Sequence, residues 1–120
     1  MSVIGEKLAE YTGKVTSSTM TDAGTAVNVE ADAGELGTIL YTTRFEPAVD
    51  AAGETGPFTV RGQGFLPDGT ARGRGTWRTI GVHRWELKTI NQAGDGQRFF
   101  VVEEADLATR STKGTIYALD

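Results

Sequence analysis

The sequence GQGFLPDGTARGRGTW, residues 62–77, contains two glycine pairs on either side of an Asp-Gly turn. Asp68-Gly69 between two alternating segments predicts a tight β-hairpin, because both central residues of a type I′ turn need a positive φ. This turn would place the glycines in two facing pairs, Gly64 with Gly73 and Gly62 with Gly75. Four positions without side chains on one face allow a sheet to bend sharply, or leave room beside it.

Alternation of apolar or small residues with polar residues continues over most of the chain, as in 27–32 and 83–88, and it is typical of antiparallel strands with one wet face. Residues 5–11 are also compatible with one or two helical turns. Short strands separated by polar turns predict a sandwich or a closed barrel. We predict one all-β domain over residues 1–120, an eight-stranded antiparallel closed β-barrel of lipocalin-like type. Its strands are expected at residues 8–18, 25–33, 37–48, 57–66, 71–79, 83–90, 97–104 and 112–119.

Composition argues against several classes of protein. The 120 residues include no cysteine, which excludes disulfides and thiolate chemistry. The net charge of -4 gives no reason to expect nucleic acid as a partner. The longest apolar run, residues 99–102, is too short to span a bilayer, so no membrane partner is expected. The N-terminal residues lack the pattern of a signal peptide, which predicts a cytoplasmic protein.

Charge is divided unevenly along the chain. Residues 19–56 hold seven acids and one base, whereas residues 61–98 hold seven bases and three acids. Two solvated faces of opposite sign would explain this division. The alternative is a pair of complementary surfaces through which copies associate, and we expect a homodimer or another homo-oligomer on this basis.

Trp77 and Trp85 share the inward phase of two neighbouring strands. A three-residue turn at residues 80–82 would place them opposite each other, beside the glycine pairs. Two interpretations remain open: the indoles fill the space that the glycines leave, or they line a ligand pocket with Tyr41 and His83. We take Tyr41, Trp77, His83 and Trp85 as candidate ligand-binding residues.

No metal or cofactor is expected. His83 is the single histidine, and no acid lies at ligand spacing around it, so it does not indicate a metal site. A rim position at the start of a strand, with a hydrogen bond to the backbone, is the simpler interpretation for it. The Gly-x-Gly pairs are not followed by a helix, so they do not predict a dinucleotide-binding loop.

Glu103 is the candidate catalytic residue. In Phe99-Phe100-Val101-Val102-Glu103-Glu104 both phases are apolar until the glutamates, so an inward Phe99 and Val101 imply an inward Glu103. A carboxyl group in an apolar interior has a raised pKa, which suits a general acid or base. The opposite orientation would leave Glu103 in solvent, where most glutamates lie.

Arg61, Arg72, Arg74 and Arg78 share the outward phase of adjacent strands. The predicted hairpin places Phe65 opposite Arg72, which favours cation–π packing for part of this set. The alternative is a surface that binds an anion or a partner.

Two segments of the chain resemble a known family. Ile4-Gly5-Glu6-Lys7-Leu8-Ala9-Glu10 with Gly13-Lys14-Val15-Thr16, and Gly62-Gln63-Gly64 before Asp68-Gly69, resemble small bacterial proteins of the allene-oxide-cyclase-barrel-like family. The resemblance implies an eight-stranded antiparallel barrel, often oligomeric, with an apolar lumen, so the barrel is expected to be of lipocalin-like or allene-oxide-cyclase-like type. It also implies ring-forming chemistry in some members, with Glu103 as the inward acid that could supply a carboxylate here.

These features lead to one main functional hypothesis: a small-molecule-binding barrel, acting as a cyclase or isomerase on an apolar substrate in its lumen. The alternatives are a non-catalytic carrier of a small apolar ligand, and a filled barrel that acts as a protein-interaction module. The volume of the lumen separates the filled barrel from the other two, and turnover separates the enzyme from the carrier.

Overall fold

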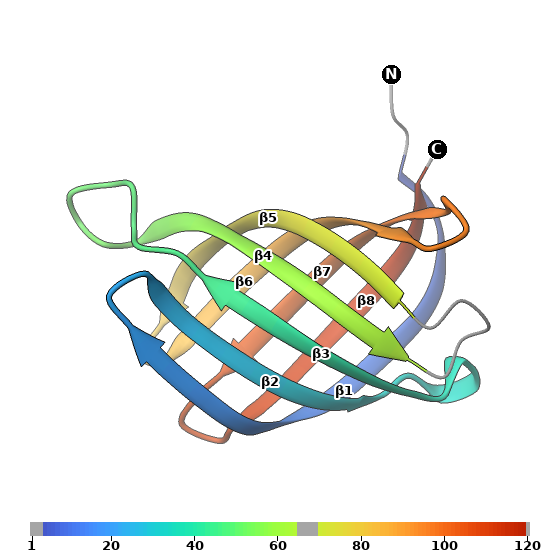
Figure 1. Cartoon of the computed structure of the whole chain (residues 1–120), viewed down its shortest axis with the longest axis horizontal. Coiled ribbons are helices and arrows are strands. Elements are labelled where there is room, and N and C mark those ends of the chain that lie inside the picture. Colours follow the sequence, from blue (N-terminus) through green and yellow to red (C-terminus); the bar gives the residue numbers. More distant parts are fainter. Residues whose placement is uncertain (1–3, 65–69, 120) are drawn as a thin grey trace.

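The computed structural model describes residues 4–64 and 70–119, without the side chains of residues 63 and 64. Each strand runs antiparallel to its neighbour in sequence, and β1 also pairs with β8, so the sheet closes into a barrel (Figure 1). The strands are β1 (Ile4–Thr21), β2 (Gly24–Asp32), β3 (Thr38–Phe45), β4 (Thr55–Gly64), β5 (Thr70–Gly81), β6 (Arg84–Ala93), β7 (Arg98–Asp106) and β8 (Ser111–Leu119).

The predicted closed eight-stranded barrel is confirmed. The alternation that predicted it separates inside from outside: Val27, Val29 and Ala31 are buried in β2, whereas Glu30 between them is exposed. Within residues 4–64 and 70–119 the single helical element is the 3₁₀ turn η1 (Gly34–Leu36). None of the helical structure in this part of the chain is long and apolar enough to cross a bilayer.

The helical turns suggested for residues 5–11 are wrong, because β1 already begins at Ile4. This segment pairs with β8, with Lys7 opposite Tyr117 and Ala9 opposite Ile116, and the ladder is irregular around Lys7. Closure of the barrel requires β1 to pair along both of its edges. Backbone pairing with a strand about a hundred residues away thus overrides a weak local preference.

The hairpin of β4 and β5 forms, but its predicted register is wrong. Gly62 pairs with Ala71 rather than Gly75, and the last described pair is Gln63 with Thr70. The observed register is not centred on Asp68-Gly69, and both residues lie outside the described residues. A shift by an even number of residues keeps every side chain on its face, so alternation alone does not distinguish these registers.

The same ambiguity affects the two tryptophans. Trp77 pairs with Leu87, and Trp85 pairs with Thr79, so the indoles are not opposite each other. β5 has an irregularity between Thr79 and Gly81, and the turn that follows it consists of Val82 and His83. His83 has a φ of 58°, a conformation that histidine adopts more readily than most residues.

The barrel has two unlike ends. The β1–β2, β3–β4, β5–β6 and β7–β8 connections lie at one end, which we call the hairpin end. There the interior is filled by a core of Phe58, Trp77, Leu87 and Ala105, against which Phe45, Val60 and Trp85 pack. The other end, which we call the terminal end, carries η1, the start of β1 and the end of β8 (Figure 1).

Trp77 does cover a glycine, although not one of the predicted four. A Cβ on Gly56, its cross-strand partner, would lie 2.8 Å from the indole ring. The indole Nε1 donates a hydrogen bond to the Glu46 carbonyl at 3.3 Å. Trp77 is therefore anchored in the core of the hairpin end, over a glycine that the sequence had not singled out.

Candidate functional site

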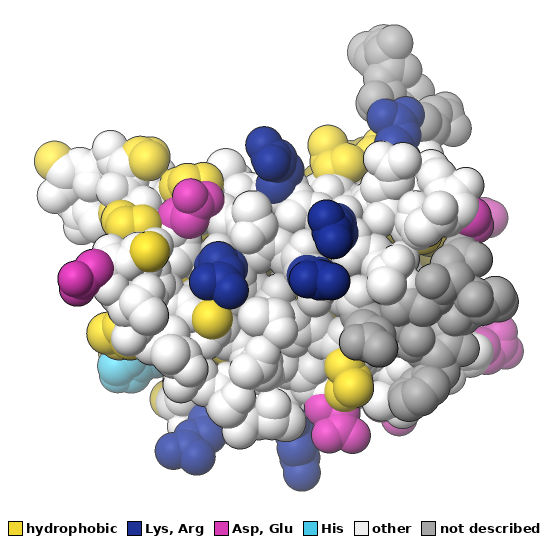
Figure 2. Space-filling view, in the orientation of Figure 1, with side chains coloured by type: hydrophobic (Ala, Val, Ile, Leu, Met, Phe, Trp, Pro, Cys, Tyr) yellow, Lys and Arg dark blue, Asp and Glu magenta, His cyan; other side chains and the backbone are white. Residues whose placement is uncertain are grey.

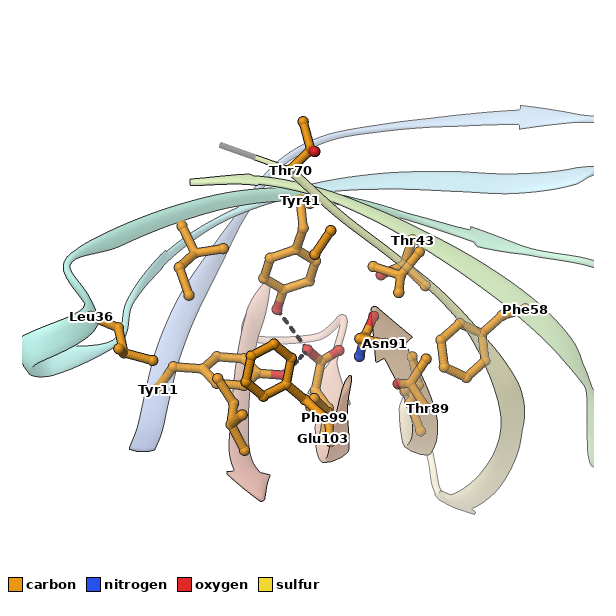
Figure 3. A pocket seen from close by; sticks show the side chains of 17 residues that line it. Tyr11, Leu36, Tyr41, Thr43, Phe58, Thr70, Thr89, Asn91, Phe99 and Glu103 are labelled. Carbon is orange, nitrogen blue, oxygen red and sulfur yellow. Dashed lines mark hydrogen bonds between the residues drawn. The ribbon is translucent and has the colours of Figure 1, made fainter. Parts of the chain in front are cut away.

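A cavity of about 140 Å³ occupies the interior toward the terminal end of the barrel (Figure 3). Most of its wall is apolar, with side chains such as Leu36, Phe99 and Ile116, and Phe58 separates it from the filled end. The volume is close to that of a protein cavity of about 150 Å³ known to bind benzene. It can therefore accommodate a molecule with a single small ring.

Glu103, a residue of β7 that is only 6% exposed, projects its carboxyl group into this cavity. The hydroxyl of Tyr11 donates a hydrogen bond to Glu103 Oε1 at 2.5 Å, and the hydroxyl of Tyr41 donates to the same oxygen at 2.6 Å. Figure 3 shows both tyrosines directed at the carboxyl group from different walls of the barrel. Oε2 accepts no hydrogen bond from a described residue and remains available to a ligand.

Thr112 on β8 completes this cluster. Its Oγ1 lies 2.9 Å from the Tyr41 hydroxyl. Because Tyr41 has one hydroxyl proton and gives it to Glu103, Thr112 is the donor in this second bond. The ring of Tyr41 also meets the ring of Tyr11 edge to face, with centroids 6.0 Å apart, so the positions of both hydroxyls are well constrained.

Two glycines make room for the cluster. Gly114 lies opposite Tyr11, and a Cβ at this position would overlap the tyrosine ring. Gly13 lies opposite Thr112, and a Cβ there would lie 2.6 Å from the threonine hydroxyl. Pairing of an aromatic ring with a cross-strand glycine is a common device in curved sheets, and here it places the Tyr11 hydroxyl beside Glu103.

Burial governs the protonation of these groups. Loss of solvent raises the pKa of Glu103 above its ordinary value of 4.5, although the hydrogen bonds from Tyr11 and Tyr41 partly oppose this shift. Burial, followed by the nearby Glu103 carboxylate, raises the pKa of both tyrosines well above their ordinary value. The tyrosines therefore stay protonated and donate, while Glu103 is the group that can gain or lose a proton.

Further polar side chains line the cavity, among them those of Thr43, Thr89 and Asn91 (Figure 3). The amide of Asn91 occupies the space above Gly73, where a Cβ would overlap it. Asn91 makes no side-chain hydrogen bond within residues 4–64 and 70–119. These groups can therefore orient a polar atom of a ligand whose apolar part contacts the rest of the wall.

Of the residues proposed from sequence, the structure brings Glu103 and Tyr41 together and places the other three elsewhere. Trp77 and Trp85 belong to the core of the hairpin end and do not line the cavity. His83 is exposed in the turn between β5 and β6. The inward phase was correct for both tryptophans, but position along the barrel axis decides which inward residues meet the cavity.

Sequence reasoning missed Tyr11, Thr112 and Asn91. Tyr11 and Gly13 alternate with the polar residues Thr12 and Lys14, and this alternation could have identified Tyr11 as a residue that faces the lumen. Thr112 and Asn91 carry no comparable signal, because threonine and asparagine are ordinary residues of strands and their turns. Within the described part of the chain, no three His, Cys, Asp or Glu side chains gather in a way that could hold a metal ion.

Comparison with family models, with curated proteins and with solved structures found no significant match to this chain. The resemblance to the allene-oxide-cyclase-barrel-like family therefore stays a prediction. The site has to be interpreted from its own geometry.

We expect Glu103→Gln to remove a pH dependence of stability. Between the unfolded pKa, near 4.5, and the higher folded pKa, the folded protein keeps a proton that the unfolded chain has released. The stabilising contribution of Glu103 is thus full below the unfolded pKa and is lost as pH rises through the folded pKa. The glutamine variant should melt close to wild type in acid and above it at higher pH, as measured by thermal denaturation across a pH series.

Glu30→Gln is the matched control, because it removes the same charge from an exposed position on β2. Its melting curve should follow wild type across the series. Parallel pH profiles for wild type and Glu103→Gln would contradict the assignment of a raised pKa to Glu103.

Proposed function

We propose that this protein binds a small, mainly apolar molecule with one polar atom in the cavity, and that Glu103 acts on it as a general acid and base. The observation that supports the proposal is the burial and the one-sided hydrogen bonding of the Glu103 carboxyl group. Oε1 is held by two tyrosine hydroxyls, whereas Oε2 has no partner among the described residues. A buried carboxyl group with a raised pKa and one free oxygen can exchange a proton with a ligand.

Isomerisation is the reaction class that fits this arrangement. The carboxylate takes a proton from a carbon next to a carbonyl, and the resulting carboxylic acid returns a proton to another carbon of the same molecule. Electrons shift within the ligand, Glu103 returns to its starting state, and no co-reactant is consumed. The protonated tyrosines keep the carboxyl group oriented throughout, and the apolar wall keeps bulk water from competing for the proton.

Binding is tested with phenol and benzene, which match the cavity in size. Both should raise the melting temperature of the wild type, and phenol should do so more strongly, because its hydroxyl can donate to Glu103 Oε2. Ala71→Leu, which adds volume to the cavity wall, should weaken both effects. No stabilisation by either compound would overturn the proposed binding site.

Catalysis is tested with 3-cyclohexenone, a single-ring ketone whose conversion to the conjugated isomer is followed by ultraviolet absorbance. Glu103→Gln keeps the shape of the site and should lower turnover by about 10²–10⁴-fold, the usual contribution of a general acid or base. Met20→Ala, which changes an exposed residue of β1, should convert the ketone like wild type. If the ketone binds and the glutamine variant converts it equally fast, the protein is a carrier and not an isomerase.

A further inference from the structure

A second hollow lies on the outer wall of the barrel, across β3 to β7. Five exposed arginines line it, and its lining includes no aspartate or glutamate. Figure 2 shows a group of Lys and Arg side chains near the centre of this face. We call this hollow the arginine groove; its arginines are Arg44, Arg61, Arg72, Arg74 and Arg98.

Strand pairing brings these charges close together. Arg61 on β4 lies directly opposite Arg72 on β5, and Arg72 and Arg74 are two residues apart on the same strand, roughly 7 Å along it. Arg44 and Arg74 both pair with Thr59 from opposite sides. Like charges directly opposite each other destabilise a sheet. The repulsion among these arginines therefore lowers the stability of the fold, and a bound anion would offset it.

The register corrects the expected partner of Arg72. The sequence predicted Phe65 opposite it and cation–π packing, whereas the structure places Arg61 there; Phe65 is outside the described residues. The repulsion between Arg61 and Arg72 therefore has no aromatic counterpart in the part of the barrel that is described.

Several other cations on the outer wall form ion pairs within the protein. Arg78 pairs with Glu86 at 2.9 Å, and Arg84 and Lys113 both pair with Glu104, at 3.5 and 3.6 Å. By contrast, four of the groove arginines make no ion pair or side-chain hydrogen bond with any residue in 4–64 or 70–119. These four are Arg44, Arg61, Arg72 and Arg74.

We propose that the arginine groove binds a small polyanion carrying two or more phosphoryl groups. The planar guanidinium group donates two parallel hydrogen bonds to phosphate oxygens, and four unpaired guanidinium groups match a ligand with several negative charges. Thr59 and Gln92 line the same groove and can donate hydrogen bonds to further oxygens. The groove is open to solvent and has a volume of about 680 Å³, in the range of sites for small molecules. A hollow of this size favours a compact ligand over a flat protein surface.

Inorganic triphosphate is the probe for this proposal. Titration calorimetry should show one site per chain, with an affinity that falls as salt rises. Arg61→Gln with Arg72→Gln should weaken binding by roughly tenfold or more, because two charge-assisted contacts are lost. Arg78→Gln, which removes a paired arginine outside the groove, should bind triphosphate like wild type.

Melting temperature distinguishes a binding defect from misfolding. The double variant should melt at or above wild type, because a like-charge contact is removed. Triphosphate should raise the melting temperatures of wild type and Arg78→Gln, and that of the double variant much less. An equal loss of affinity in Arg78→Gln would overturn the proposal. Tighter binding of a single-stranded oligonucleotide or an acidic peptide than of triphosphate would also overturn it, and would indicate a surface for a macromolecule.

Discussion

Phe58→Ala is expected to lower the free energy of unfolding by about 3–5 kcal/mol, the usual cost of removing a buried phenylalanine ring. Phe58 is 2% exposed, belongs to the core of the hairpin end and also lines the cavity. Domains of this size are stable by about 5–15 kcal/mol, so the variant should lose a large share of its stability. Urea denaturation followed by circular dichroism measures the change.

The same substitution should change which ligands fit. Removal of the ring extends the cavity toward the hairpin end, so naphthalene should stabilise Phe58→Ala more than it stabilises wild type. Met20→Ala is the control, because Met20 is 82% exposed and surface truncations usually change stability by less than about 0.5 kcal/mol. A Phe58→Ala protein as stable as Met20→Ala would show that the two ends of the barrel are not divided as described.

Gly114→Ala is expected to destabilise the fold by about 1–3 kcal/mol, the typical cost of overpacking. The added Cβ would overlap the ring of Tyr11, which must move and so loses its hydrogen bond to Glu103. Because this bond lowers the pKa of Glu103, the pKa should rise further in the variant. Thermal melting measures the first effect, and carbon-13 NMR titration of the carboxyl group measures the second.

Gly62→Ala provides the matched control on β4. A Cβ at Gly62 has Tyr41 Cβ as its nearest neighbour, at 3.8 Å, which is ordinary van der Waals contact. We expect this variant to melt at or above wild type, because alanine has less freedom in the unfolded chain. Equal stabilities for the two alanine variants would contradict the role of Gly114 as the space for Tyr11.

Much of the fold could be predicted because alternation is a local property. The inward phases of β2, β5 and β6 were readable from adjacent residues, whereas the inward orientation of Glu103 was one of two that the sequence left open. Strand ends were predicted within a few residues of the observed bounds, except where β1 extends to Ile4. Registers were not readable, since shifts by two residues leave each side chain on the same face.

The sequence by itself determined the alternation of inward and outward residues and the antiparallel strands, and it left two orientations open for the acid Glu103. Only the tertiary structure decided what that acid meets. Tyr11 and Tyr41 come from β1 and β3, 92 and 62 positions before Glu103, and closure of the barrel brings both hydroxyls to one carboxylate oxygen. The curvature and register of the strands also decided that the two tryptophans fill the hairpin end of the barrel, while the cavity lies toward the terminal end. The spatial positions of these side chains depend on the pairing of all eight strands at once, and no local sequence pattern encodes them.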